Sequence, residues 1–276
     1  MTRMESAVVE FDGGELAWES AGEGPDVVFL HPGLWDGRVW DEQFGVFSRT
    51  HRVLRLDFRG YGRSSLPEPG RPYSHVEDVA AVMDEAGVEG AALIGNSMGG
   101  QVAVDFALTH PPRVSALVLA SPALSGFEGT QDEEAAWEAA FADVERQIQE
   151  AVTAGDLEEA QDLRLRWLWA PLGTDDAAGS LIRRIAFENL QELTMDESGE
   201  KGIDPVAAGR LGEIEVPTLV LPADHDPPWH ERMCEVLAEG IRGARLVRIP
   251  ETDHVIPLRR PREFNGVVLD YLGEVL

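Results

Sequence analysis

The chain has 276 residues, of which 43% are hydrophobic and 26% are charged. A chain of this size and composition can bury a full core without disulfides, metals or an obligate partner, which excludes disordered and collagen-like classes. The 50 acidic residues outnumber the 23 basic ones and give a formal net charge of −27. Such a charge disfavours nucleic acid and anionic membrane surfaces as partners.

Cys234 is the single cysteine, so an internal disulfide and a multi-cysteine metal site are excluded. No stretch approaches the ~18 apolar residues of a membrane span, and residues 1–10 lack the apolar run of a signal peptide. We therefore expect a cytoplasmic protein, a monomer or a homodimer, in which Cys234 packs as a small hydrophobic side chain.

The chain begins with two short apolar-rich runs, Ala7–Phe11 and Leu16–Ser20, on either side of Asp12-Gly13-Gly14. They predict an antiparallel hairpin, because glycine tolerates the positive φ of a tight turn. Six later runs are apolar without alternation, which is typical of strands buried on both faces: Val27–Leu30, Val53–Leu56, Ala91–Ile94, Ala116–Ala120, Thr218–Leu221 and Leu246–Ile249.

Helical patterns separate these runs at Ser74–Ala86, Ser97–Leu108 and Pro261–Leu272. In the first of them, Ser74 and Glu77 have the spacing of a capping box. Alternating strands and helices predict an α/β fold, with a mostly parallel eight-stranded sheet and helices on both faces.

Between about residues 127 and 207 the alternation stops and the sequence becomes continuously helical. Thr130 and Glu133 form a capping box, and a stripe of apolar residues follows at three- or four-residue spacing: Trp137, Phe141, Val144, Ile148 and Val152. A block of ~80 residues is too long for a crossover. We expect a helical lid, residues 126–205, inserted into a core of residues 1–125 and 206–276, with the stripe mainly packed and partly lining a ligand pocket.

The strongest signal for chemistry is Gly95-Asn96-Ser97-Met98-Gly99, directly after one predicted strand and before a predicted helix. This is the pattern of a nucleophile elbow, in which the strand turns sharply and presents a serine in a strained conformation. Larger side chains at the two glycines would collide with neighbouring backbone. We predict that Ser97 is a catalytic nucleophile.

A serine hydroxyl is a poor nucleophile at neutral pH and needs a general base. Of the seven histidines, His254 is best placed, because it follows the last predicted strand by a short polar loop and reaches the same sheet edge as Ser97. The base also needs a carboxylate to fix its tautomer. Asp224 and Asp226 both follow the strand predicted at 218–221. Side chains at 224–226 alternate in direction, so no metal site is predicted there.

Acyl transfer needs backbone N–H donors aimed at the oxyanion. One is expected at Met98, the residue after the nucleophile. The other is expected at Leu34, because Pro32 has no N–H and Gly33 lets the backbone pass close to the site. His31 is expected to brace this loop rather than to transfer protons.

At these motifs the chain resembles the α/β-hydrolase superfamily, in its branch of small lidded serine hydrolases. The resemblance covers the loop at 31–33, the turn Asp57-Phe58-Arg59-Gly60-Tyr61-Gly62-Arg63-Ser64, the elbow and the block at 250–264. It implies the α/β-hydrolase fold and the order serine, acid, histidine. It also favours Asp226 over Asp224, since the family places its acid last in this segment, although Ala223 stands where the family usually has glycine. Asp57 is expected to hold loops by hydrogen bonds.

The resemblance implies a serine hydrolase that cleaves a carboxylic ester or lactone without cofactor or metal. A small-molecule substrate would lie in a pocket walled by Trp35, Leu124, Trp137, Phe141, Trp167, Trp169 and Trp229. The arginines of the lid are expected to be solvated rather than to bind a substrate carboxylate: Arg164, Arg166, Arg183 and Arg184.

Two alternatives remain. The run Gly95–Gly100 resembles that of carbon–carbon bond hydrolases of aromatic ring-cleavage products, but Val255 follows His254 where that subfamily has an aromatic residue. Some members of the fold are small-molecule receptors with little turnover. An intact set of Ser97, Asp226 and His254 would count against a receptor.

Overall fold

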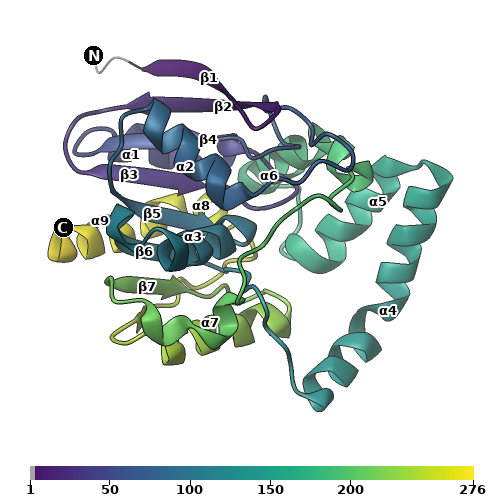
Figure 1. Cartoon of the computed structure of the whole chain (residues 1–276). Helices are drawn as coiled ribbons and strands as arrows, with labels where there is room; N and C mark the ends of the chain where they lie inside the picture. Colours follow the sequence, from purple (N-terminus) through teal and green to yellow (C-terminus); the bar gives the residue numbers. More distant parts are fainter. Residues whose placement is uncertain (1–3) are drawn as a thin grey trace.

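A computed structural model describes residues 4–276. Eight strands form one sheet with the order β1-β2-β4-β3-β5-β6-β7-β8 (Figure 1). Their bounds are β1 Glu5–Phe11, β2 Gly14–Ala21, β3 Asp26–Leu30, β4 Arg52–Leu56, β5 Ala91–Asn96, β6 Val114–Ala120, β7 Thr218–Leu221 and β8 Arg245–Leu246. The pairs β1–β2 and β2–β4 are antiparallel and the other five pairs are parallel. The fold class and the opening hairpin are therefore confirmed.

The eighth strand differs from the prediction. We expected it at Leu246–Ile249, whereas β8 consists only of Arg245 and Leu246, and both are exposed at the edge of the sheet. Val247 still donates its N–H to the carbonyl of Val220, but the chain then leaves the sheet and buries Ile249 in the core. An edge strand has neighbours on one side only, so burial of its apolar residues does not require continued pairing.

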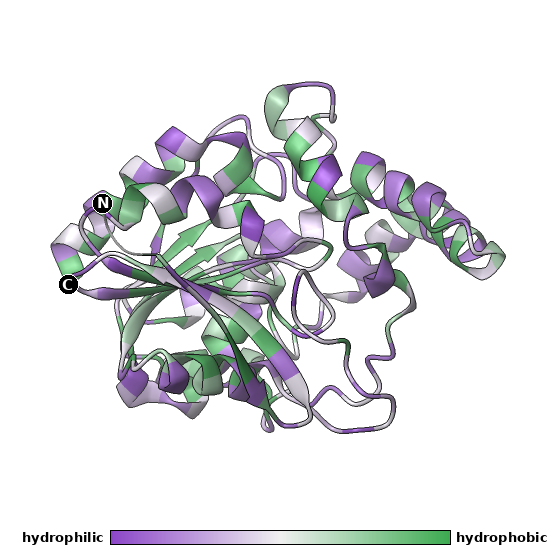
Figure 2. Ribbon diagram, turned by 90° about the horizontal axis from the view of Figure 1, so that it is seen from above, coloured by the Kyte–Doolittle hydropathy of each residue, from purple (hydrophilic) through white to green (hydrophobic). Residues whose placement is uncertain are grey.

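Helices cover both faces of the sheet (Figure 2). The helices are α1 Asp41–Phe47, α2 His75–Glu85, α3 Met98–Thr109, α4 Gln131–Ala154, α5 Leu157–Arg164, α6 Ala177–Phe187, α7 Pro228–Gly240, α8 Ile256–Arg259 and α9 Pro261–Val275. Side chains such as Val28 and Leu30 pack with α2, α3 and α7, whereas Val27 and Phe29 pack with α1 and α9. Alternate residues of one strand are thus buried on opposite faces of the sheet. This explains why these strands do not alternate between apolar and polar residues in the sequence.

The predicted capping box at Ser74 is wrong. Ser74 is the N-cap of α2 but its side chain makes no capping hydrogen bond. Glu77 lies 3.3 Å from the ring of His110, at the end of α3, and is therefore not available to Ser74. The second predicted box is confirmed, since Thr130 and Glu133 exchange side chain to backbone hydrogen bonds at the start of α4.

The segment between β6 and β7 is helical, as expected, and contains α4, α5, a π-helical turn at Leu165–Trp169, and α6. α4 extends away from the sheet in both ribbon views (Figures 1 and 2). None of its residues is buried, and its apolar stripe is only half-buried, so the expectation that this stripe mainly packs is wrong. α5 and α6 are held closer, because the Trp35 indole donates to the carbonyl of Ile182.

Cys234 is 1% exposed and packs in the core, as predicted. Within residues 4–276, none of the helices combines the length and the apolar character that crossing a membrane requires.

Candidate active site

Ser97 lies at the turn between β5 and α3 with φ 53° and ψ −116°. This left-handed backbone is rare for a residue with a side chain and stores strain. The flanking glycines make the turn possible: a Cβ at Gly95 would lie 2.2 Å from the carbonyl oxygen of Gly99, and one at Gly99 would lie 2.1 Å from that of Leu30. The geometry is that of a nucleophile elbow, which presents the serine at the carboxyl edge of the sheet.

The loop after β3 carries the second expected oxyanion donor. Leu34 is buried there and has φ 70°, another left-handed backbone at a residue that is not glycine. His31, at the base of the loop, has Nδ1 2.8 Å from the Pro32 carbonyl and accepts the Phe58 N–H at Nε2, 2.9 Å away. Burial lowers the pKa of His31, so the ring is neutral and can make both contacts. His31 therefore braces this loop.

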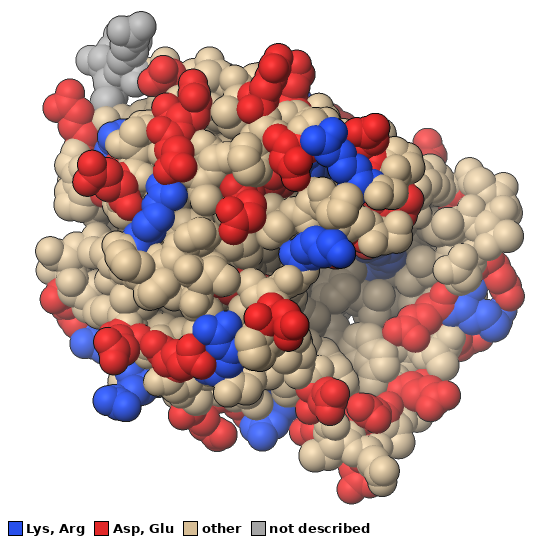
Figure 3. Space-filling view, in the orientation of Figure 1, with Lys and Arg blue, Asp and Glu red and all other residues tan. Residues whose placement is uncertain are grey.

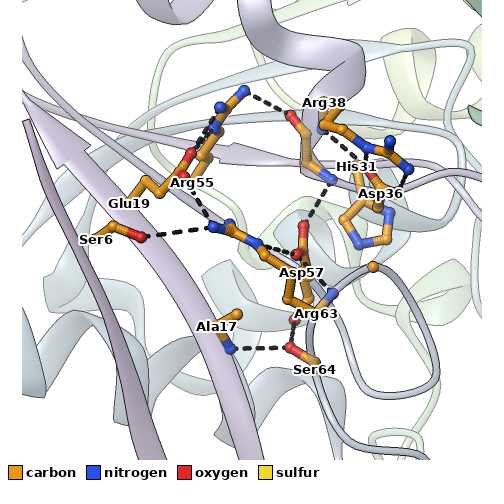
Figure 4. Close-up of polar contacts among 12 residues, drawn as sticks. Ser6, Ala17, Glu19, His31, Asp36, Arg38, Arg55, Asp57, Arg63 and Ser64 are labelled. Carbon is orange, nitrogen blue, oxygen red and sulfur yellow. Dashed lines mark hydrogen bonds and ion pairs between the residues drawn. The ribbon is translucent and has the colours of Figure 1, made fainter.

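Asp57 ties the same loop to the end of β4 (Figure 4). One carboxylate oxygen accepts the N–H of Gly37 at 2.9 Å, and the other accepts both the backbone and the guanidinium N–H of Arg63. Asp36 is held in turn by Arg38 and by the amide of Asn189, at 2.8 Å. This network fixes the loop that carries Leu34, which is the role that the sequence indicated for Asp57.

His254 and Asp226 form a buried pair at this edge. Nδ1 of His254 lies 2.8 Å from Oδ1 of Asp226, and both side chains are 2% exposed. Burial by itself would raise the pKa of Asp226, but the His254 ring, with smaller contributions from His230 and the Ser121 hydroxyl, holds it below its ordinary value. Asp226 therefore remains a carboxylate and directs Nε2 of His254 away from itself.

Asp224, the other predicted acid, lies elsewhere. It accepts the backbone N–H of Glu251 at 2.9 Å and pairs with Arg248 at 3.4 Å. It thus supports the loop before His254 from outside the site. Residues 224–226 form a turn rather than an extended strand, so the two acids reach different partners.

Two further contacts position the backbone of His254. The buried amide of Asn96 donates to the carbonyls of Ala120 and His254, at 2.9 and 3.1 Å. Asp253 receives the guanidinium of Arg259 through both carboxylate oxygens. His254 and Ser97 are thereby brought to one sheet edge through Asn96, while among the described residues no hydrogen bond joins their side chains.

Sequence analysis missed one member of the site. His230, in the first turn of α7, has its ring centroid 4.8 Å from that of His254, and Trp169 lies against both rings, at 5.3 and 4.5 Å. The sequence singled out His254 alone among the seven histidines. The useful signal was that this helix begins directly after Asp226, so its first turn must lie at the same sheet edge.

The predicted pocket residues fall into two groups. Trp137, Trp169 and Trp229 line a cavity of about 440 Å³ beside His254, and Phe141 joins Trp137 and Trp229 around an adjoining cavity of about 260 Å³. The other three line neither cavity: Trp35 and Leu124 are buried in the core, and Trp167 is 53% exposed. Figure 3 shows the hollow between α4 and the core, with walls that are mostly uncharged and with both acidic and basic side chains around its rim.

Most of the lid arginines face acidic neighbours in the lid itself. Arg164 pairs with Glu192, and both Arg166 and Arg183 pair with Asp162. Arg164, Arg166, Arg183 and Arg184 are not among the residues that line the two cavities beside α7. The charges of Arg164, Arg166 and Arg183 are therefore balanced within the helical segment between β6 and β7.

Comparison with known proteins agrees with the fold. Residues 26–261 match the family described as alpha/beta hydrolase fold. A hydrolase from Pseudomonas aeruginosa PA01 is 30% identical, has a TM-score of 0.79, and aligns over 97% of this chain and 98% of its own. Est816, described as an N-acyl homoserine lactone degrading enzyme, is 29% identical with a TM-score of 0.69, over 96% of this chain and 99% of its own.

Carboxylesterase YbfK of Bacillus subtilis (strain 168) is 27% identical over 91% of this chain and 81% of its own. Other relatives are named for methyl ester and dienoate hydrolysis, so the family leaves the substrate open. What these proteins share is the fold and hydrolytic chemistry. The chain belongs to the α/β-hydrolase family and is a hydrolase.

Proposed function

We propose that the protein is a serine hydrolase that cleaves a carboxylic ester or a lactone. The observation that carries the proposal is the buried His254–Asp226 pair at the sheet edge where Ser97 stands in a strained elbow. With Nδ1 of His254 donating to Asp226, Nε2 is the ring atom that remains for the proton of Ser97.

The reaction follows from these roles. Oγ of Ser97 attacks the carbonyl carbon while His254 takes its proton, and the resulting oxyanion accepts the backbone N–H groups of Met98 and Leu34. The bond to the leaving oxygen then breaks as His254 returns the proton to it. Water, deprotonated by His254, cleaves the acyl–serine ester and regenerates Ser97. Asp226 stabilises the imidazolium in both halves of the reaction.

The walls of the cavity favour an ester or lactone with apolar substituents. The cavity beside His254 is lined by Ala123, Trp137, Trp169, Trp229, His230 and Met233. A substrate carboxylate, such as a carbon–carbon bond hydrolase of ring-cleavage products would bind, needs a cation that this wall does not offer. The lactone-degrading activity in the description of Est816 is in keeping with this proposal.

The proposal is tested with a fluorophosphonate probe, which reacts only with activated serines, followed by mass spectrometry of the labelled peptide. We expect labelling of Ser97 alone, and its loss in Ser97→Ala and in His254→Ala. The same three proteins are then assayed on a panel of aryl esters and lactones. A folded wild-type protein that is neither labelled nor active on the panel, yet binds a small molecule, would replace the hydrolase by a receptor.

A further inference from the structure

A second imidazole stands beside the proposed base and has no role in the reaction above. His230 is delivered by the first turn of α7, and its ring is nearly perpendicular to His254, at 86°, and to Trp169, also at 86°. Because α7 begins directly after the segment that carries Asp226, the helix fixes His230 at this place.

The side chain of His230 makes no hydrogen bond to the residues that the structure describes. The residue is 8% exposed, and its Nδ1 is enclosed without a hydrogen-bond partner among the described residues. Burial, and then the neighbouring His254, lower the pKa of His230 to about 4, so the ring is neutral at pH 7. Because Nδ1 is enclosed, Nε2 is the ring nitrogen that remains for a ligand in the cavity that His230 lines.

The ring of His230 forms part of the wall of the 440 Å³ cavity. Most of the other residues that line the cavity have no free donor for a hydrogen bond to a ligand. Ala123 and Met233 have no donor, and the indole N–H of Trp137 already donates to Glu145 at 3.0 Å. The Trp169 indole nitrogen is enclosed in protein. Of the two polar groups that remain in this wall, the indole N–H of Trp229 and the imidazole of His230, His230 is the one that lies against the ring of His254.

We propose that His230 is a specificity-determining residue, which donates a hydrogen bond from Nε2 to a neutral oxygen on the substrate substituent that fills this cavity. The inference rests on the proposed function and adds the substrate class to it. A buried N–H without a partner is less tolerated than a buried lone pair, which leaves the enclosed Nδ1 unprotonated and puts the proton on Nε2.

The Nε2–H of His230 restricts which substrate groups can bind beside it. An N–H requires an acceptor, and ether, keto and hydroxyl oxygens are acceptors that an uncharged aromatic wall accommodates. The proximity of His230 to His254 places this oxygen within a few bonds of the reacting carbonyl. The favoured substrates are therefore esters or lactones with an apolar group that carries one neutral oxygen near the scissile bond.

The test is a scan with one oxygen in an otherwise apolar chain. Nitrophenyl heptanoate is compared with its analogues in which a single chain CH2 is replaced by an ether oxygen, and a second series places the oxygen in the alcohol chain of heptyl acetate. kcat/KM is measured for wild type, His230→Phe and His230→Gln. His230→Phe keeps a ring and removes the donor, whereas His230→Gln keeps an N–H near the position of Nε2. Met233→Leu serves as the control in the same wall.

The quantity of interest is the ether-to-CH2 ratio of kcat/KM in each protein, because comparing ratios between proteins cancels the intrinsic reactivity of each ester. We expect one ether position at which the wild-type ratio exceeds that of His230→Phe by about 3- to 10-fold, as for one hydrogen bond. His230→Gln is expected to recover part of this preference and Met233→Leu to keep it.

Equal ratios in wild type and His230→Phe at every position, in a wild-type enzyme that hydrolyses the parent esters, would overturn the role of His230 and leave the hydrolase standing. A wild-type protein that hydrolyses none of the esters and is not labelled at Ser97 would overturn both proposals.

Discussion

The side-chain amide of Asn96 donates a hydrogen bond to the backbone carbonyl of His254, 3.1 Å away, and another to the carbonyl of Ala120. The residue before the nucleophile thus fixes the loop of the base from inside the sheet. Asn96 is fully buried, so no water can replace it in these contacts. One side chain therefore links the ends of β5 and β6 with the loop of His254.

Substitution of Asn96 should lower both the stability and the activity of the protein. Asn96→Ala leaves two buried carbonyls without these donors, and we expect the free energy of unfolding to fall by about 2 kcal/mol. Because the His254 loop is then held less firmly, kcat should fall more than KM rises. Urea unfolding and steady-state kinetics on one nitrophenyl ester check both effects. An unchanged kcat in a destabilised Asn96→Ala protein would show that the link serves stability alone.

The two aspartates after β7 offer a matched pair of variants. Asp226→Asn removes the carboxylate that contacts His254, and under the proposed mechanism we expect kcat to fall by about 10⁴-fold, as in characterised serine hydrolase triads. Asp224→Asn alters only the outer contacts to Arg248 and Glu251 and should change kcat by less than about 3-fold. Comparable losses in the two variants would contradict the assignment of Asp226.

Ser121 is expected to tune the base through Asp226. Its hydroxyl, directly after β6, makes a minor contribution to the lowered pKa of Asp226, while the hydroxyl and Oδ2 of Asp226 are both buried without a hydrogen-bond partner among the described residues. Without this hydroxyl, less of the negative charge of Asp226 is offset by a neighbouring dipole. The carboxylate should then stabilise the protonated ring of His254 more strongly. The acid limb of kcat/KM in Ser121→Ala should therefore move up by about 0.5 pH units.

The control for this profile is Ser125→Ala, which removes a hydroxyl that donates to Asp105, away from the site. Its acid limb should coincide with that of wild type. A Ser121→Ala profile that also coincides with wild type would remove Ser121 from the positioning of Asp226.

The glycines differ in the space that is available for the methyl group of an alanine substitution. At Gly99 a Cβ would lie 2.1 Å from the Leu30 carbonyl, so Gly99→Ala should destabilise the protein by about 3 kcal/mol through overpacking. Gly45, in α1, has nothing within 4 Å, so Gly45→Ala should stabilise by about 0.5 to 1 kcal/mol through helix propensity. Thermal unfolding of the two variants measures the contrast, and shifts of the same sign would refute it.

Burial of His230 makes stability depend on pH. Its folded pKa, about 4, lies below the ordinary 6.5, so the unfolded chain binds the proton more readily. This contribution to stability is complete above pH 6.5 and is lost as the pH falls toward 4. Between pH 7 and pH 5 wild type should lose about 2 kcal/mol more than His230→Phe, as measured by urea unfolding at both values. Parallel losses would mean that His230 is accessible to protons in the folded state.

Much of this molecule can be derived from local sequence patterns. The elbow follows from glycines on either side of Ser97, because only their lack of side chains allows the turn. The hairpin at 12–14 and the capping box at Thr130 depend on neighbouring residues alone, and the structure contains both. Interactions of this kind act over a few residues and are visible as spacing.

Other features depend on partners distant in the chain. Ser74 has the spacing of a capping box, but Glu77 is taken by His110 from another helix. The stripe on α4 has the period of a packed helix, yet the fold brings no partner that buries it. A periodic pattern shows which face is apolar, and only the tertiary arrangement decides what covers that face.

The site divides in the same way. The sequence by itself determined which residue types could do the chemistry, since Ser97 and His254 stand in recognisable positions after predicted strands. The family resemblance favoured Asp226, and the tertiary structure brings it to His254 while Asp224 pairs with Arg248. Only the tertiary structure decided that His230 lies beside them. The physical reason is that these contacts join elements that are distant in the sequence and meet at one sheet edge. Which side chain of a loop faces which partner depends on the backbone conformation of that loop, and local sequence patterns do not show it.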